Sequence, residues 1–306
     1  FNELSKKDIK TAGGKGASLG EMSKFGIPVP PGFVVLASAF ENFISKNHID
    51  VEIDAQLKKV NVKKVSTVEK ASKFLRGVIA RYEMPKEIAQ EILKSFDKLK
   101  AKYVAVRSSA TAEDSRIASW AGELESYLGI NRKQVVEAVL KCWSSLFTPR
   151  AIFYRIEKKL HGKQVSVAVV VQKMVESEVA GVAFTVHPVT RDSNQMVIEA
   201  SWGLGESVVS GKVTPDTYIV DKKKMEILDI NINEQTTKIV RVGAKTKTVK
   251  VPKSVAGKQC LPNKKIIELA KICKKIEDHY GFPCDIEWAY EKGKIYIVQS
   301  RPITTL

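Results

Sequence analysis

Hydrophobic residues recur at helical spacing through the first half of the chain and at alternate positions through the second half. Helical patterns in the first half cover residues 38–47, 67–82, 86–99 and 150–159. A further helix is predicted from a cap at Asn131 to about Phe147, and Ser66 with Glu69 forms a capping box for the helix over 67–82. One apolar strand, 103–107, lies between the helix over 86–99 and the helix capped at Asn131. The first half is therefore predicted to be helix-rich.

Alternating or continuous apolar runs mark the second half as strand-rich. The predicted strands are 165–172, 179–186, 195–201, 217–221 and 225–230. One helix, 264–280, precedes a final hairpin that ends near Pro302. This arrangement predicts an α+β fold, with a helix-rich first lobe over residues 1–172 and a strand-rich second lobe over 173–306. Ligands favour the cleft between two such lobes.

The final hairpin, CDIEWAYEKGKIYIVQSRP, carries four strong polar residues at alternate positions: Asp285, Glu287, Gln299 and Arg301. A three-residue loop centred on Gly293 would set Glu287 opposite Gln299 and Asp285 opposite Arg301, all on one face. A two-residue loop would separate the two acids from the amide and the guanidinium.

We expect the three-residue loop, because it leaves a largely apolar reverse face. That face would carry Ile286, Trp288, Tyr290, Tyr296 and Val298. Two carboxylates and an amide oxygen suit Mg²⁺ that carries phosphates, since Mg²⁺ takes oxygen ligands and shares them with its substrate. The alternative is a solvated sheet face with a cross-strand ion pair.

Two polar, glycine-bearing segments of the first lobe are candidates for phosphate contact. In TAGGKGASLGEM (11–22), glycines flank Lys15 after a strand-like start, and a helix follows with its N-terminus toward the loop. In AVRSSATAED (105–114), Arg107 ends a buried strand, and its planar guanidinium matches a phosphate. The alternatives are a tight turn with an exposed lysine, and a salt bridge from Arg107 to Glu113 or Asp114.

A second glycine-bearing loop, SWGLGESVVSG (201–211), lies in the strand-rich half. Glu199 and Glu206 beside it are candidate polar contacts, and either acid could instead cap a helix. The segment SWAGELES (119–126) offers a glycine-containing flap around Gly122.

The composition is that of a globular protein with a basic surface. Apolar residues make up 44% of 306 positions and charged residues 27%, with a net charge of +16. Because 40 of the 50 basic residues are lysines, scattered without aromatic partners, a solvated surface is favoured over a nucleic-acid site. No apolar run reaches the roughly 20 residues of a membrane span, and the start does not resemble a signal peptide.

Cysteine and histidine patterns argue against several other chemistries. The four cysteines have no CxxC spacing, which predicts buried thiols in a reducing cytoplasm. The four histidines are dispersed, without the spacing of a zinc site.

Taken together, seven segments resemble the N-terminal ATP-binding part of phosphoenolpyruvate synthase, within a group that includes pyruvate phosphate dikinase and rifampin phosphotransferase. These segments are GGKGASLGEM, GIPVPPGF, AVRSSATAED, CWSSLFTPRAIFYR, VVVQKMV, GLGESVVSGKVTPDTY and DIEWA…YIVQSRP. They occur in the family's order over nearly the whole chain. The resemblance implies an ATP-grasp type fold that holds ATP between two lobes.

By this resemblance, Lys15 and Arg107 contact the phosphates, and Glu287 and Gln299 bind Mg²⁺ with Asp285 beside them. Arg301 would steady the terminal phosphates. The adenine would meet the crossover between the two lobes, VQKMV (171–175), through backbone groups, with Met174 on the ring. The remaining candidate ATP contacts are Ser108, Gly122, Gln172, Lys173, Val175 and Glu206.

Members of the group pass a phosphoryl group from ATP to a histidine on a separate swivelling domain, within a loop that resembles TSHAA. This sequence contains neither that loop nor the barrel that binds pyruvate. The resemblance therefore implies a phosphohistidine domain as partner and pyruvate as a substrate only through another domain. An antibiotic kinase with the same ATP domain, or a basic nucleic-acid-binding module, are the alternative functions.

Overall fold

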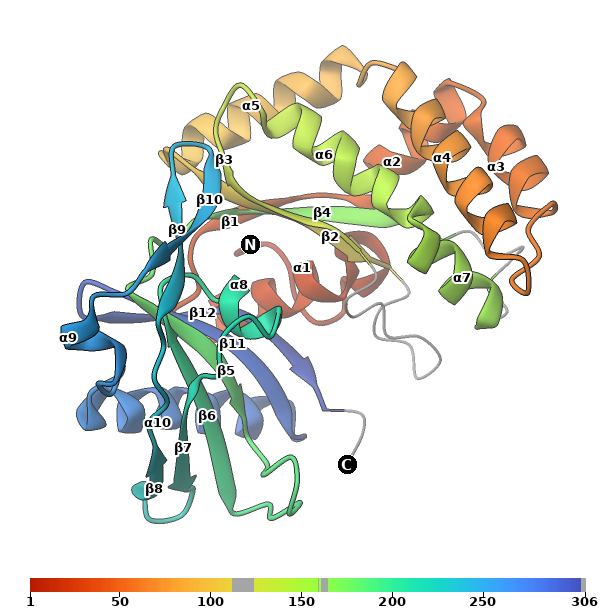
Figure 1. Cartoon of the computed structure of the whole chain (residues 1–306). Helices are drawn as coiled ribbons and strands as arrows, with labels where there is room; N and C mark the ends of the chain where they lie inside the picture. The colour runs from red at the N-terminus through yellow and green to blue at the C-terminus, as the bar shows by residue number, and fades with distance from the viewer. Residues whose placement is uncertain (112–123, 159, 161–164, 304–306) are drawn as a thin grey trace. The chain divides into compact units, whose positions relative to one another are not determined.

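The computed structural model describes residues 1–111, 124–158, 160 and 165–303, and its contacts divide the chain into two units. The first unit comprises Phe1–Glu21 and Pro31–Met174, and the second comprises Met22–Pro30 and Val175–Leu306. Helices dominate the first unit and strands the second (Figure 1). The α+β prediction is therefore confirmed. Within the described ranges, none of the helices combines the length and the hydropathy needed to span a bilayer.

The first unit is built on a four-stranded antiparallel sheet in the order β1-β4-β2-β3. Its strands are β1 (Gly32–Val35), β2 (Val104–Ala110), β3 (Ser126–Ile130) and β4 (Val167–Lys173). Its helices are α1 (Ile9–Lys24), α2 (Ala37–Lys46), α3 (Ile49–Leu57), α4 (Val65–Arg81), α5 (Lys86–Leu99), α6 (Val135–Ser144) and α7 (Pro149–Glu157), with a 3-10 turn at Ser145–Phe147.

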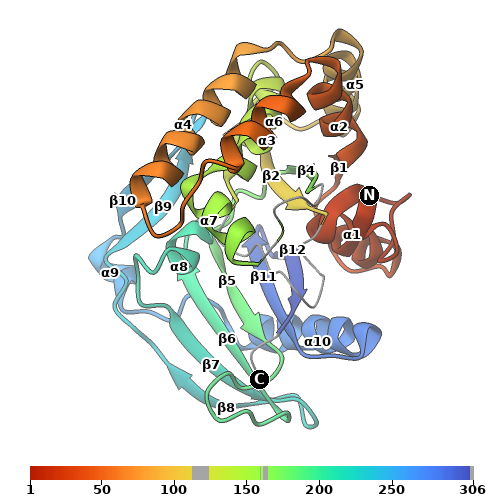
Figure 2. The same cartoon turned by 90° about the vertical axis from the view of Figure 1, so that its right-hand side faces the viewer.

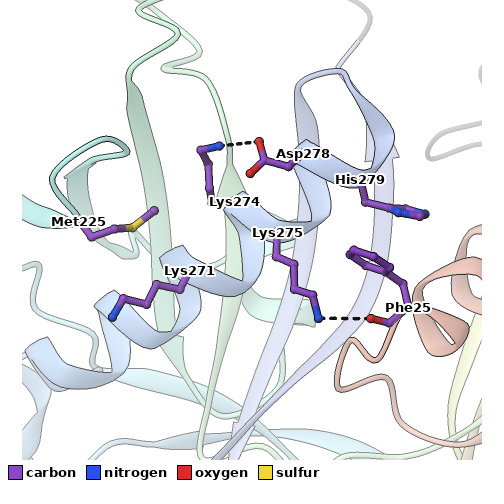
Figure 3. Close-up of a pocket in the computed structure, with 7 residues that line it drawn as sticks. All are labelled: Phe25, Met225, Lys271, Lys274, Lys275, Asp278 and His279. Atoms are coloured by element: carbon purple, nitrogen blue, oxygen red, sulfur yellow. Dashed lines mark hydrogen bonds and ion pairs between the residues drawn. The ribbon is translucent and has the colours of Figure 1, made fainter.

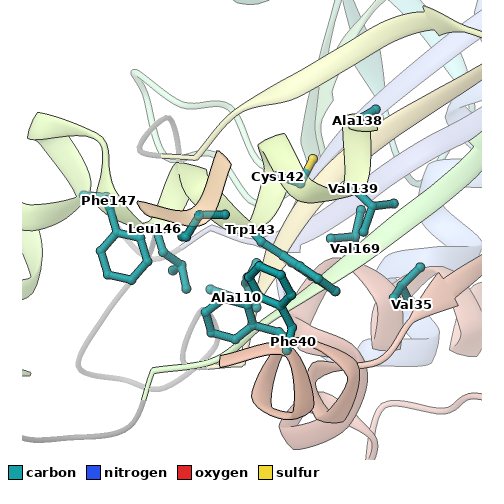
Figure 4. Close-up of a cluster of buried hydrophobic side chains, with 14 of the residues drawn as sticks. Val35, Phe40, Ala110, Ala138, Val139, Cys142, Trp143, Leu146, Phe147 and Val169 are labelled. Atoms are coloured by element: carbon teal, nitrogen blue, oxygen red, sulfur yellow. The ribbon is translucent and has the colours of Figure 1, made fainter. Parts of the chain in front are cut away.

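One face of this sheet forms the main core with α2, α4 and α6. Val104, Val106 and the alternate valines of β4 point to this face, where Trp143 of α6 is fully buried beside two phenylalanines (Figure 4). The rings of Phe43 and Trp143 lie 5.2 Å apart. Burial of apolar surface is the dominant favourable contribution to the folding free energy of a domain, and large aromatic side chains such as these bury much of it. Helix α1 packs against the opposite face, where Gly16 approaches Val34.

The second unit contains a six-stranded antiparallel sheet in the order β12-β11-β5-β6-β7-β8. The strands of this sheet are β5 (Val179–Phe184), β6 (Gln195–Trp202), β7 (Asp216–Asp221), β8 (Glu226–Asn231), β11 (Cys284–Glu291) and β12 (Lys294–Pro302). The remaining elements are β9 (Thr237–Val242), β10 (Lys245–Lys250), α8 (Glu206–Val209), α9 (Lys253–Ala256) and α10 (Asn263–Tyr280). β9 and β10 pair with each other to form a two-stranded sheet, and Ile239 of β9 also makes an isolated bridge to Gly203.

Several local predictions differ from the structure. The strand-like start is wrong, because residues 1–8 form turns and α1 begins at Ile9. The capping box is wrong as well: α4 has Lys64 at its N-cap, without a side-chain cap, and Ser66 lies inside the first turn. β2 continues to Ala110, so the polar residues after Arg107 belong to the strand rather than to a loop. The four cysteines are buried and free, as predicted.

Helix α10 covers one face of the six-stranded sheet because its apolar residues recur every three or four positions. Ile266, Leu269, Ala270, Cys273 and Ile276 are buried. An ion pair fixes the end of the helix to the sheet. Glu277 accepts hydrogen bonds from Lys222 Nζ at 2.8 and 2.9 Å, and only 8% of the lysine side chain is exposed.

We expect the loss of one charge of the Lys222–Glu277 pair to lower the free energy of unfolding strongly, and the replacement of both residues by apolar ones to lower it little. Glu277→Leu leaves a buried ammonium unpaired and should lower the free energy of unfolding by about 3–5 kcal/mol. The double variant Lys222→Met/Glu277→Leu removes both charges and should recover most of that loss. Urea unfolding of the wild type, both single variants and the double variant measures the coupling. If the loss of unfolding free energy in the double variant equals the sum of the losses in the two single variants, the two residues are not coupled and the prediction is wrong.

Candidate functional site

The final hairpin of the second unit pairs its four polar residues as predicted. In the β11–β12 ladder, Asp285 lies opposite Arg301 and Glu287 lies opposite Gln299. Side chains at alternate positions share a face, so all four lie on one side of the sheet. The hairpin therefore collects two carboxylates, an amide and a guanidinium on a single surface.

The turn that was expected to produce these pairs is different. Lys292 and Gly293 form a two-residue loop, because Glu291 pairs directly with Lys294. Both loop residues have positive φ, 48° and 81°, as type I′ turns require. A β-bulge then shifts the register between Glu287 and Trp288. The bulge restores the pairing that the three-residue loop would have given.

The bulge also changes which side chains of β12 face the core. Ile295 and Ile297 pair with Tyr290 and Trp288, and both are at most 3% exposed. The prediction that Tyr296 and Val298 join the apolar face is therefore wrong, because the two-residue turn moves this part of β12 by one position. Ile286 and Trp288 lie on the buried face as predicted.

Asp285 and Arg301 form the cross-strand ion pair that the alternative interpretation of the hairpin described. Arg301 Nε donates to Asp285 Oδ2 at 2.8 Å, and a terminal guanidinium nitrogen lies 2.7 Å from the same oxygen. The other oxygen, Oδ1, is enclosed and has no hydrogen-bond partner among the residues that the structure describes. Burial raises the pKa of Asp285, the Arg301 charge opposes this, and Glu287 adds to it.

Glu287 and Gln299 lie next to this pair, toward the turn of the hairpin. Glu287 is half-buried, whereas Gln299 is only 7% exposed. Across the sheet, Glu287 pairs with Val182 of β5, which in turn pairs with Glu199 of β6. Burial raises the pKa of Glu199, and the nearby charge of Asp285 raises it further. The structure therefore adds Glu199 to the same face.

Glu206, the other acid near the glycine-bearing loop, is placed differently. It opens the short helix α8, and its carboxylate lies 3.8 Å from Lys212 Nζ. Its contacts are therefore local to the loop that follows β6.

The donor set of the hairpin fits a hard divalent cation that shares its ligands with a nucleotide. Among the described residues, no group of three His, Cys, Asp or Glu side chains is arranged to hold a metal ion alone. Mg²⁺ is usually bound through one or two carboxylates together with phosphate oxygens and water, rather than in an all-protein cage. Asp285 Oδ1, which is enclosed and finds no partner within the described part of the chain, is an acceptor that such a cation or its water would satisfy.

In the first unit, Lys15 lies just after a break in α1. Gly13 has φ 69° and ψ 170°, so the helix restarts immediately before Lys15. A Cβ on Gly13 would lie 2.2–2.3 Å from Ser109 Oγ and O, so only glycine fits there. Ser109 Oγ donates to the Ala12 carbonyl at 3.0 Å and accepts from the Gly16 amide at 3.2 Å. Strand β2 therefore fixes the glycine-rich segment through Ser109, a residue that the sequence did not single out.

Arg107 and Ser108 point to opposite faces of β2. Arg107 is half-buried on the face that carries α1, and it shares that face with Ser109. Ser108 is 1% exposed on the core face, where its hydroxyl lies 2.9 Å from Ser145 Oγ and 3.0 Å from the Glu125 carbonyl. The structure therefore brings Lys15, Arg107 and Ser109 to one side of the sheet and Ser108 to the other.

The predicted adenine segment follows directly from β4. Gln172 is 1% exposed and pairs with Ala105, which places it on the Arg107 face of the sheet. The amides of Lys173 and Met174 donate to the Pro31 and Tyr103 carbonyls at 2.8 and 3.1 Å. A backbone contact to adenine would need other groups, such as those of Val175.

The last predicted contact, Gly122, lies outside the described residues.

A concavity of about 430 Å³ lies on α10, beside Phe25 and Met225, and three of its lining residues are lysines (Figure 3). Lys274 is paired there with Asp278, and Lys275 donates to the Phe25 carbonyl. None of the predicted site residues lines this pocket, so it does not identify the site.

Comparison with known proteins assigns the chain to a family. Residues 9–306 match the pyruvate phosphate dikinase, AMP/ATP-binding domain. The whole chain is 50% identical to a probable phosphoenolpyruvate synthase of Methanocaldococcus jannaschii and 44% identical to the phosphoenolpyruvate synthase of Pyrococcus furiosus. It covers 26% and 43% of those proteins, and so spans less than half of their length.

Substitution of Gly13 tests whether the break in α1 is required. Gly13→Ala should lower the free energy of unfolding by about 2–5 kcal/mol, because the new methyl group meets Ser109 at a backbone conformation that favours glycine. Gly77→Ala is the control, since Gly77 is exposed within α4 and a Cβ there meets nothing within 4 Å. That variant should gain about 0.5–1 kcal/mol. If the two substitutions change the free energy of unfolding in urea by similar amounts, the break in α1 does not require glycine at position 13.

The pKa shift of Asp285 predicts a pH dependence in metal-free protein. Because its folded pKa is raised, the folded state binds the proton more tightly, and that stability is lost as pH rises from about 4 through the folded pKa. Asp285→Asn should therefore gain stability relative to wild type between pH 4 and pH 7 in EDTA.

Asp221→Asn provides a control of opposite sign. Hydrogen bonds from the Lys224 and Lys223 amides are among the causes that lower the pKa of Asp221, so its contribution is lost as pH falls. Urea unfolding at several pH values compares the two variants. Parallel pH profiles for the two would show that burial does not govern Asp285.

Proposed function

The chain belongs to the family of pyruvate phosphate dikinase AMP/ATP-binding domains, and we propose that it binds MgATP as the phosphoryl-donor part of a phosphoenolpyruvate synthase-type dikinase. The observation that carries this proposal is the ladder register of β11 and β12. It pairs Asp285 with Arg301 and Glu287 with Gln299 on one sheet face. Such a face suits a triphosphate only when a cation lies between the carboxylates and the phosphates.

Each unit contributes one part of the proposed binding machinery. In the second unit, Glu287 and Gln299 would hold Mg²⁺, which supplies charge neutralisation of the phosphates when bound. In the first unit, Lys15 and Arg107 would contact phosphate oxygens, with Arg107 offering a planar fork of donors. Ser109 keeps the Lys15 segment in place through its hydrogen bonds to Ala12 and Gly16.

The complete reaction in such an enzyme converts ATP, pyruvate and water to AMP, phosphoenolpyruvate and phosphate. We propose that this chain donates the phosphoryl group to a histidine on a separate domain, and that pyruvate binds elsewhere. The names of the relatives support the pyruvate branch over an antibiotic kinase. The protein's part is to orient the nucleotide and neutralise its charge, since phosphoryl transfer depends mainly on positioning and electrostatics.

Substitution of Arg107 tests the phosphate contact. Charge-assisted hydrogen bonds contribute about 1.5–3 kcal/mol, so Arg107→Ala should weaken ATP binding roughly ten- to a hundredfold while barely changing adenosine binding. Arg107→Lys should restore little, because one ammonium cannot replace the fork. Arg132→Ala is the control, since Arg132 is exposed and paired with Asp97. Isothermal titration gives the affinities, and equal losses for both ligands would make Arg107 structural.

The division of labour between domains is tested by assaying AMP and phosphoenolpyruvate. These 306 residues with MgATP and pyruvate should form no phosphoenolpyruvate, because the positioned histidine acceptor is supplied by another domain. A separately expressed phosphohistidine domain of a relative should become phosphorylated when it is added. Phosphoenolpyruvate made by the 306 residues alone would overturn this account.

A further inference from the structure

The segment 175–178 of the second unit leads into β5 and begins with Val175, whose backbone is the candidate contact for adenine. Val175 is half-buried, and the hydrogen bonds of the described residues include none to its amide or its carbonyl. An adenine edge offers both a donor and an acceptor, so it can use both groups. A backbone that already holds these groups in place binds the base at a lower cost in conformational entropy.

The second half of this segment is fixed by the end of the six-stranded sheet. The Glu178 amide donates to the Tyr290 carbonyl at 2.9 Å, and the Glu178 carboxylate accepts from the Lys292 amide at 3.0 Å. The Gly203 amide donates to the Glu178 carbonyl at 2.8 Å, and the Ser177 hydroxyl donates to the Gly203 carbonyl at 3.0 Å. These contacts hold Ser177 and Glu178 against the ends of β6 and β11.

Glu176, the residue next to Val175, is fixed by a different element. Arg241 of β9 donates from Nε to Glu176 Oε1 at 2.5 Å, and 18% of the arginine side chain is exposed. Arg241 also donates from Nη1 to the Gly243 carbonyl at 2.8 Å, in the turn between β9 and β10. The amide of Glu176 makes a longer contact, 3.3 Å, to a carboxylate oxygen of Glu291. The ion pair with Arg241 is therefore the main restraint on the residue beside Val175.

The ribbon formed by β9 and β10 contributes little to the core of the second unit. Figures 1 and 2 show it beyond one end of the six-stranded sheet. Within these two strands, both fully described, only Ile239 is buried, and it lies against Gly203. The Glu176 side chain is 40% exposed, and ion pairs with exposed partners stabilise a fold weakly. The contact between Arg241 and Glu176 is thus better explained as a restraint on the segment 175–178 than as a support of the fold.

We propose that Arg241 is a positioning residue for adenine, which acts through Glu176 to hold the backbone of Val175 in the conformation that receives the base. This inference rests on the proposed function, because it requires that ATP binds along the segment 175–178. Arg241 itself touches neither the base nor the phosphates. Its loss should therefore weaken ligands that contain adenine and spare ligands that consist of phosphates alone.

The test compares MgATP with magnesium tripolyphosphate, which carries the phosphates without the nucleoside. Isothermal titration gives the affinity for MgATP, and competition with MgATP gives the affinity for tripolyphosphate. Arg241→Gln should weaken MgATP about five- to thirtyfold, the cost of fixing one backbone residue on binding, and tripolyphosphate by less than about twofold. Lys247→Gln is the control, since Lys247 is exposed on β10 and the variant removes the same charge from the ribbon. It should keep both affinities, and equal losses for the two ligands in Arg241→Gln would overturn the inference.

A double-mutant cycle tests whether Arg241 acts through Glu176. Glu176→Gln should weaken MgATP by a factor similar to that of Arg241→Gln, because either substitution removes the ion pair. The double variant Glu176→Gln/Arg241→Gln should bind MgATP no more weakly than the weaker of the two single variants. If the two losses multiply in the double variant, Arg241 does not act through Glu176 and the inference is wrong.

Stability separates positioning from a structural role. The midpoint of thermal unfolding of Arg241→Gln should lie within about 3 °C of wild type, because the pair is partly exposed. If Arg241→Gln fails to fold, Glu176→Gln supplies the comparison of the two ligands, and failure of both variants to fold would show that the pair is structural.

The remaining outcomes distinguish this inference from the proposed function. If wild type binds MgATP and Arg241→Gln binds it equally well, the positioning role is refuted and the ATP function stands. If wild type binds neither MgATP nor magnesium tripolyphosphate, both proposals fail together.

Discussion

The register of the β11–β12 hairpin is the constraint on which the candidate site depends. A type I′ turn at Lys292 and Gly293 sets one pairing, and the bulge beside Glu287 changes it by one residue. Because side chains alternate with a period of two, a shift of one residue would move Gln299 and Arg301 to the core face. The bulge thus lets Ile295 and Ile297 enter the core while the polar residues beyond it stay together on the other side.

The polar face of the β11–β12 hairpin is supported from the other side of the sheet, and this packing offsets the destabilising effect of its partly buried carboxylates. The reverse side of the sheet is covered by α10, whose apolar stripe and Glu277–Lys222 pair fix it to the strands. Trp288 and Ile286 are at most 1% exposed on that side. Burial raises the pKa values of Asp285 and Glu199, so keeping both ionised opposes folding. We interpret that cost as the consequence of holding carboxylates ready for a cation.

In the first unit, the backbone geometry at Gly13 positions the charged residue Lys15. Gly13 interrupts α1 so that Lys15 begins a new helical segment against β2, and Ser109 fixes the break from the strand. The positive charge of Lys15 is therefore carried by a segment whose conformation only glycine allows.

The sequence predicted the polar pairs of the hairpin because strand alternation is short-range and strong. It could not predict the bulge, since a two-residue turn with a bulge gives the same pairs as a three-residue turn. The core position of Ser108 was not predicted, because the end of β2 was set at Arg107, and extending the strand to Ala110 turns that hydroxyl into the core. Glu199 was a candidate polar contact, but the sequence could not place it near Glu287. Their distance depends on the order of the strands in the sheet, in which β5 lies between β6 and β11. β10 alternates lysine and threonine rather than apolar residues, so its pattern did not predict a strand, and β9 was missed with it.

The central claim is that Glu287 couples a divalent cation to the nucleotide. Isothermal titration of ATP into wild type and Glu287→Gln, each in Mg²⁺ and in EDTA, tests it directly. Wild type should bind ATP at least tenfold more tightly in Mg²⁺ than in EDTA. Glu287→Gln should bind equally weakly in both, at about the affinity of wild type in EDTA. A Glu287→Gln variant that keeps the full Mg²⁺ dependence would contradict the account.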